Sequence, residues 1–149
     1  MNFANPTREQ FKAMYGLSGN QSVHMLNLLR FLDHAEYGPA DPERDSAQVS
    51  GRDAYQRYSA EAEPILRSVG GTLIWVGQPR TMFIGPSDEV WSLAFVACYP
   101  TVQAFIDMVK SEAYQRAARH RTAGIMDSRL VVCSPLQPGA SFAPMAYLP

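Results

Sequence analysis

Residues 23–32, with the sequence VHMLNLLRFL, decide the fold of this chain. The run is short and almost entirely apolar, and turn-rich segments flank it, so it is typical of a strand buried at the centre of a sheet. Successive side chains of a strand point to opposite faces. Both faces are apolar here, with Met25, Leu29 and Phe31 on one and Leu26, Leu28 and Leu32 on the other. Both faces of the sheet must therefore be covered.

Helix caps, apolar periodicity and turn residues divide the chain around this strand. Thr7 with Gln10, and Ser50 with Asp53, are typical helix starts, because each pair can satisfy free backbone amides. The further elements that these signals predict are a helix over 50–71, a strand over 72–84, a turn at 85–88, a strand over 90–99, a helix from 101 that Ser111 caps again into a second segment, and a strand over 125–133.

The order of strand, helix, strand, strand, helix, strand predicts an α+β fold, a ferredoxin-like βαββαβ sandwich. Right-handed crossovers place both helices on one face of an antiparallel sheet with the strand order 4-1-3-2. We expect one domain over 1–149, with a core over 22–134, an N-terminal helical extension over 1–21 and an extended proline-rich tail over 135–149.

The second face of this sheet is apolar but has no helix to cover it. The chain can offer only its tail, whose apolar side chains make such a contact plausible on the same or on a partner protomer. A second copy of the protein is the better cover, because exposed apolar patches commonly mark interfaces and most oligomers are symmetric. The sequence therefore predicts a homodimer that associates through the sheet face.

Composition excludes several classes of protein. The chain has 149 residues and 16.5 kDa, of which 46% are hydrophobic and 18% charged, which is typical of one globular domain. Thirteen basic and fourteen acidic side chains give a net charge of -1, which argues against nucleic-acid binding. No apolar run approaches the ~18 residues of a membrane span, so we expect no membrane partner.

The two cysteines and the N-terminal sequence favour a cytoplasmic location. Residues 1–11 lack the basic and apolar segments of a signal peptide. Cys98 and Cys133 fall on two predicted strands that the first strand separates, roughly 9.6 Å apart, which exceeds the reach of a disulfide. We expect two free, buried thiols.

The RNA-recognition module shares this order of elements and is the main alternative binding class. Its third strand needs exposed aromatic residues in the pattern basic, Gly, aromatic, small, Phe, Val. Residues 91–96 of this chain read WSLAFV and match only the last three positions of the pattern. Without a basic surplus, RNA binding is disfavoured.

Several motifs resemble the bacterial proteins of domain-of-unknown-function family 1330. They are MLNLLRF at 25–31, SGRDAY at 50–55, GP at 85–86 with Trp91, YP at 99–100, EAY at 112–114, HRTA at 120–123 and DSRL at 127–130. The resemblance spans about residues 23–134 and implies membership of the dimeric α/β-barrel superfamily, in which two ferredoxin-like protomers press their sheets together. It implies no settled activity. Many relatives have an acidic residue after the tryptophan, but this chain has Ser92, so no role for that acid carries over.

Polar residues interrupt the first and last strands and form the first group of site candidates. Asn27 and Arg30 lie on the first strand, three residues apart and therefore on opposite faces, while Asp127 and Arg129 share one face of the last. A buried guanidinium requires a partner. Either these groups orient a small anion, or Arg30 and Asp127 form a structural ion pair.

His120 is the second kind of candidate, because its titration range suits a general base near neutral pH. Alternatively, it complements the helix dipole as a residue at the C-terminal end of its helix. Tyr58 and Trp75, with Tyr55 and Trp91, could line a pocket, although aromatic residues at such spacing are more often core. No grouping of His, Cys, Asp and Glu has the spacing of metal ligands, so we expect neither a metal nor a cofactor.

The sequence predicts a small-molecule-binding homodimer of the dimeric α/β-barrel type. Its ligand is expected to be small, partly apolar and anionic, with Asn27, Arg30, Tyr58, Trp75 and Arg129 as the ligand-binding candidates. The alternative is a cofactor-independent enzyme, an isomerase or monooxygenase by analogy with superfamily relatives, in which His120, Asp127 and Arg30 act. Analogy of fold is a weak warrant for that alternative.

Overall fold

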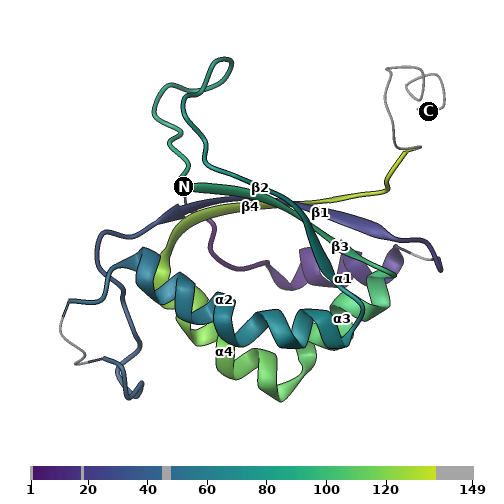
Figure 1. Ribbon diagram of the computed structural model, residues 1–149, viewed down its shortest axis with the longest axis horizontal. Coiled ribbons are helices and arrows are strands. Elements are labelled where there is room, and N and C mark those ends of the chain that lie inside the picture. Colours follow the sequence, from purple (N-terminus) through teal and green to yellow (C-terminus); the bar gives the residue numbers. More distant parts are fainter. Residues whose placement is uncertain (1, 18, 45–47, 137–149) are drawn as a thin grey trace.

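Four strands form one antiparallel sheet in the order β2-β3-β1-β4 (Figure 1). The structure is a computed structural model that describes residues 2–17, 19–44 and 48–136. The strands are β1 (Val23–Phe31), β2 (Thr72–Gly77), β3 (Leu93–Tyr99) and β4 (Ile125–Cys133). This is the predicted strand order, and the ferredoxin-like α+β fold is confirmed.

Three helices, α2 (Gly51–Ser68), α3 (Val102–Lys110) and α4 (Glu112–Gly124), lie on one face of the sheet (Figure 1). Ser50 begins α2 by accepting a hydrogen bond from the Asp53 amide, as predicted. Ser111 ends α3 and caps α4, so the predicted division of this helix is also confirmed. Helix α1 (Arg8–Gly16) begins at the predicted Thr7–Gln10 capping box and packs beside α3.

The hairpin formed by β2 and β3 is antiparallel, as expected, but both strands are shorter than predicted. Strand β2 ends at Gly77 and β3 begins at Leu93, so residues 78–84 and 90–92 belong to a loop over 78–92 instead of to the two strands. Pro79 cannot donate to a strand ladder, and Gly85, with a φ of 144°, adopts a conformation that favours glycine. The loop rises from the sheet on the side away from the helices (Figure 1).

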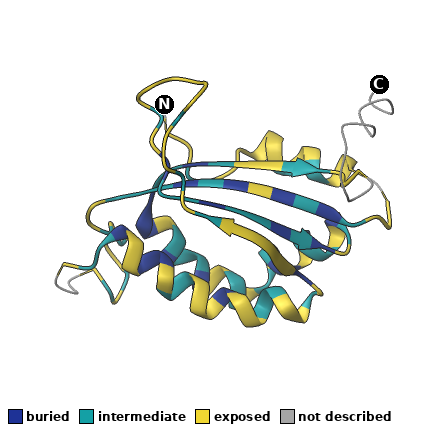
Figure 2. Cartoon of the chain, turned by 45° about the horizontal axis from the view of Figure 1, so that its top comes forward, coloured by how far each residue is buried: buried dark blue, intermediate teal, exposed yellow. Residues whose placement is uncertain are grey.

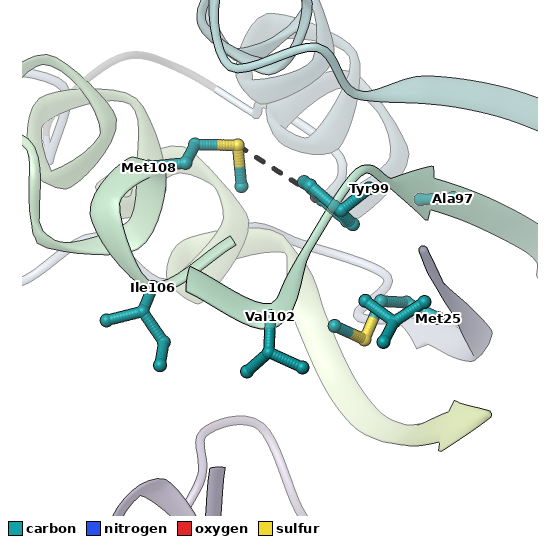
Figure 3. Close-up of a cluster of buried hydrophobic side chains, with 7 residues drawn as sticks. Met25, Ala97, Tyr99, Val102, Ile106 and Met108 are labelled. Atoms are coloured by element: carbon teal, nitrogen blue, oxygen red, sulfur yellow. Dashed lines mark hydrogen bonds between the residues drawn. The ribbon is translucent and has the colours of Figure 1, made fainter. Parts of the chain in front are cut away.

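The core fills the space between the sheet and the helices. Figure 3 shows its larger cluster, in which Met25 and Ala97 of the sheet lie near Val102, Ile106 and Met108 of α3. A smaller cluster joins Leu29 of β1 to Tyr55 of α2 and Ile125 of β4. Met25, Asn27 and Leu29 of β1 point to the helices and are buried, which anchors the sheet against α2 and α4.

The opposite face of the sheet is open along the described residues, and no described helix covers it (Figures 1 and 2). One register row crosses all four strands there, and we call it the apolar row: Trp75, Val96, Leu26 and Val131. Trp75, Leu26 and Val131 are 54%, 38% and 51% exposed. The tail over 137–149, which could also cover this face, lies outside the described residues.

No helix among the described residues is both long enough and apolar enough to cross a bilayer.

Candidate functional site

A cavity of about 230 Å³ lies between the sheet and the helices, on the helix side of β2 and β3. Leu73 and Val76 of β2 and Phe95 of β3 line it from the sheet. Helix α2 contributes the side chains opposite them, among them Ala62 and Leu66. The lining is mainly apolar and aromatic, as in most small-molecule sites.

Four tyrosines surround the cavity, namely Tyr55 and Tyr58 from α2, Tyr99 from β3 and Tyr114 from α4. The hydroxyls of Tyr58 and Tyr114 share a hydrogen bond of 3.1 Å. The Tyr99 hydroxyl donates to Met108 Sδ at 3.9 Å, the contact drawn in Figure 3. Burial raises the pKa of Tyr55, Tyr58 and Tyr99 above the ordinary value. These phenols are therefore neutral hydrogen-bonding groups at physiological pH.

The cavity opens between α2 and the edge strand β2. Its exposed lining residues, Ser59, Glu63, Leu73 and Val76, come from these two elements. Glu63 is the only charged residue among the described ones that line the cavity, and its carboxylate is engaged by Arg67 in an ion pair. The site therefore offers aromatic surface and neutral hydroxyls, and it presents no cation to a bound molecule.

A glycine contact holds α2 and α4 in place over the sheet. The Gly51 amide donates to the carbonyl of Leu32 at 3.1 Å, and the Leu32 amide donates to the carbonyl of Gly124 at 3.0 Å. A Cβ at Gly51 would lie 2.3 Å from the Leu32 oxygen and 2.5 Å from the Gly124 oxygen. Only glycine permits this approach, which sets where the start of α2 and the end of α4 sit.

The five ligand-binding candidates from the sequence do not form one site. Tyr58 lines the cavity. Asn27 also lies on the helix side, but it is buried and its amide donates to the Met25 carbonyl at 2.9 Å. Trp75, Arg30 and Arg129 belong to the open face, as their cross-strand partners show. The sheet therefore separates the two arginines from the cavity.

The expected ion pair between Arg30 and Asp127 is not formed, although the two residues lie opposite each other in the register. Asp127 Oδ1 instead accepts hydrogen bonds from Arg129 Nη1 at 2.7 Å, from the Phe3 amide at 2.7 Å and from the Ser128 amide at 2.9 Å. Arg129, two residues along the same face of β4, is the guanidinium that binds this carboxylate. Within the described parts of the chain, Arg30 has no ion-pair partner.

Opposing influences act on the pKa of the Asp127 carboxyl. Burial would raise it, but the hydrogen bonds from Phe3 and Arg129 outweigh burial and hold the pKa below its usual value. The Arg129 guanidinium also lies over the Phe3 ring, 5.0 Å from its centroid. Asp127 and Arg129 thus fasten the N-terminal segment to the edge of the sheet.

His120 is buried in the structure, with only 2% of its surface exposed. Its Nδ1 lies 2.6 Å from the Tyr37 hydroxyl, and its Nε2 lies 3.4 Å from Glu61 Oε1. Burial raises the pKa of Tyr37, and the nearby Arg57 partly offsets that shift. His120 therefore ties the segment after β1 to α2 and α4, and it shares no partner with Asp127.

The sequence interpretation named Tyr55 and Tyr58 as possible lining residues but missed Tyr99 and Tyr114. These two lie on different elements, β3 and α4, and no local spacing relates them to Tyr58. The only available signal was their place in the short YP and EAY motifs.

Among the described residues, no three His, Cys, Asp or Glu side chains gather where they could hold a metal ion.

The family model of a domain of unknown function, DUF1330, matches residues 45–134. This chain belongs to the DUF1330 family. A crystal structure of a protein of unknown function from Rhodopseudomonas palustris is 36% identical, with a TM-score of 0.83, and the match covers 93% of this chain and 100% of that one. No curated protein matches.

A more distant structure shares the fold. A proposed antibiotic biosynthesis monooxygenase from Bacteroides thetaiotaomicron is 13% identical, with a TM-score of 0.50, and the match covers 81% of this chain and 95% of that one. At this identity the likeness concerns the fold alone.

Proposed function

We propose that this DUF1330 protein is a homodimer that binds a small, largely apolar molecule in the cavity of each protomer. The observation that carries the proposal is the cavity of about 230 Å³ walled by four tyrosines. Apolar cavities of about 150 Å³ admit a benzene ring. A cavity somewhat larger than that suits one ring with a few substituents.

The lining also selects the polarity of the ligand. Aromatic rings pack edge to face around the cavity, with the centroids of Tyr58 and Tyr114 separated by 6.0 Å. The hydroxyls of these two tyrosines can exchange their mutual hydrogen bond for one to a carbonyl or hydroxyl of the ligand. The anionic character expected from the sequence depended on Arg30 and Arg129, and neither lines the cavity. The proposed ligand is therefore neutral.

The dimer part of the proposal rests on the open face of the sheet. The apolar row exposes large side chains there, and a second copy related by a two-fold axis would cover both rows at once. Cys98 and Cys133 flank His24 in the register and are half-buried, not buried as the sequence predicts. Free thiols at these positions support the reducing cytoplasm as the proposed location.

The enzyme alternative has weaker support. It requires His120, Asp127 and Arg30 to act together, but His120 contacts Tyr37 and Glu61 while Asp127 contacts Phe3 and Arg129. Catalysis is therefore not part of the proposal.

Phenol and indole are suitable probes for the cavity, since each has one aromatic ring system and one hydrogen-bonding group. We expect both to bind and to perturb the NMR resonances of residues lining the cavity. Ala97→Leu, which adds volume at a buried lining position, should abolish this binding, while Tyr15→Phe, outside the cavity, should leave it unchanged. Absence of binding at millimolar probe, or equal binding to folded Ala97→Leu, would refute the cavity as the site.

A further inference from the structure

Residues 78–92, the β2–β3 loop, carry apolar side chains, Phe83 and Ile84 among them, that the rest of the described chain leaves exposed. Phe83 and Ile84 at its tip are 92% and 86% exposed, more than any other large hydrophobic residue described. The loop stands on the open side of the sheet, opposite α2 and α4 (Figure 1). Figure 2 shows most of this loop in the colour of exposed residues.

The tip of this loop has a defined turn. Gly85 adopts a φ of 144°, and a Cβ there would lie 2.7 Å from the Met82 sulfur, so the Met82 side chain packs across the glycine. The Glu89 amide donates to the Pro86 carbonyl at 3.2 Å and closes a second turn. Phe83 and Ile84 thus lie between residues whose turn contacts are defined, and both remain exposed.

The base of the loop is fixed to the sheet. The Ser92 amide donates to the Leu29 carbonyl at 2.7 Å, and the Phe31 amide donates to Ser92 Oγ at 3.2 Å. Arg129 of β4 lies over the Trp91 ring, 5.2 Å from its centroid, and 3.5 Å from the Glu89 carboxylate. The loop is therefore anchored at the edge of the open face.

A body that covers the apolar row must lie beside this loop, because both occupy the same side of the sheet. We propose that the β2–β3 loop of each protomer packs on a second copy of this chain and buries Phe83 and Ile84 against it. The inference rests on the proposed homodimer and assigns this loop to its interface.

The charge of the loop argues against a lipid surface as the occupant. Residues 78–92 contain one basic residue, Arg80, and two acidic residues, Asp88 and Glu89, for a net charge of -1. Interfacial segments that bind membranes usually carry a basic surplus. A symmetric pair of chains instead covers two loops and two apolar rows in a single contact.

Photo-crosslinking tests which chain the loop contacts. The full-length variant Phe83→p-benzoylphenylalanine is prepared with ¹⁴N and with ¹⁵N, and the two preparations are mixed. On irradiation, we expect crosslinked dimers that contain one chain of each isotope. The same substitution at Leu17, which is half exposed at the end of α1, serves as the control and should give few such dimers. Crosslinks within one chain only would overturn the proposal.

Analytical ultracentrifugation separates this inference from the dimer itself. Phe83→Ser combined with Ile84→Ser should raise the dimer dissociation constant at least tenfold, while Leu17→Ser should not change it. A monomeric wild-type chain would overturn both proposals. A dimer whose dissociation constant is unchanged in the double variant would overturn the role of the loop alone. The same conclusion would follow if the wild type bound phosphatidylcholine vesicles, the double variant did not, and the loop made no contact with a second chain.

Discussion

The two faces of β1 have similar side chains but different surroundings. On the helix side, Met25, Asn27 and Leu29 are buried by residues of the same chain. On the open side, Leu26 is exposed and Leu28 and Arg30 are half-buried. The strand alternates between these environments at every residue, so the cover of each face cannot be deduced from hydrophobicity alone.

Each face of the sheet suits one of the two proposed roles, ligand binding or association with a second copy. On the helix side, the described helices cover the sheet and leave the tyrosine-lined cavity, which suits a small molecule. The open side is a sheet surface crossed by an apolar row, and it suits a second protein surface. Substitutions on one side should therefore affect stability or ligand binding, and those on the other should affect association.

The largest expected effect on stability comes from Leu29, which is compared with Leu28, its neighbour on the other face of β1. Leu29→Ala removes a side chain that is 1% exposed and should lower the free energy of unfolding by about 2–5 kcal/mol. Leu28→Ala should cost less in dilute monomer, and its effect should grow with protein concentration. Urea denaturation at several concentrations measures both. Equal losses at all concentrations would refute the division between the faces.

The glycine contact between α2 and α4 should give the next largest effect. Gly51→Ala forces a Cβ against the Leu32 and Gly124 carbonyls and should cost about 1–3 kcal/mol through overpacking. Gly38→Ala is the matched control, because its Cβ would meet nothing within 4 Å. Thermal denaturation distinguishes the two variants, and similar melting temperatures would contradict the close approach.

A smaller effect is expected at the hydroxyl pair in the cavity. Tyr58→Phe and Tyr114→Phe each break the same 3.1 Å hydrogen bond and should each cost about 0.5–1.5 kcal/mol. The double variant should cost less than the sum, because the first substitution already removes the bond. A double-mutant cycle by urea denaturation measures this coupling, and full additivity would argue against the bond.

Sequence alone predicted the fold because its signals were local and consistent. The two-sided apolar strand and the serine caps placed β1, α2 and the division between α3 and α4. The predicted length of β2 was wrong for a physical reason. Phe83 and Ile84 are apolar enough to suggest strand, yet they lie on an exposed loop, so their hydrophobicity does not reflect the core of this chain.

The site was harder to predict because its contacts join distant segments. Tyr58 was identified, but its partner Tyr114 lies 56 residues away on another helix. The Arg30–Asp127 pairing was a sound inference from strand order, and the two residues do face each other. The predicted pair is not formed because the Asp127 carboxylate instead accepts hydrogen bonds from the neighbouring Arg129 and from the Phe3 amide, which lies 124 residues away in the sequence.

The smallest expected effect concerns Asp127 at the edge of the open face, and it depends on pH. Its pKa is lowered in the folded chain, so ionised Asp127 stabilises the fold above the unfolded pKa of about 4. That contribution is lost as the pH falls through the folded pKa. Asp127→Asn should therefore be less stable than the wild type by about 0–1 kcal/mol at pH 7, since partly exposed ion pairs contribute little. The difference should shrink as the pH falls below that unfolded pKa and disappear once the pH is below the folded pKa. Urea denaturation across this range measures it, and a difference that stays constant with pH would show that the carboxylate does not fasten the N-terminal segment.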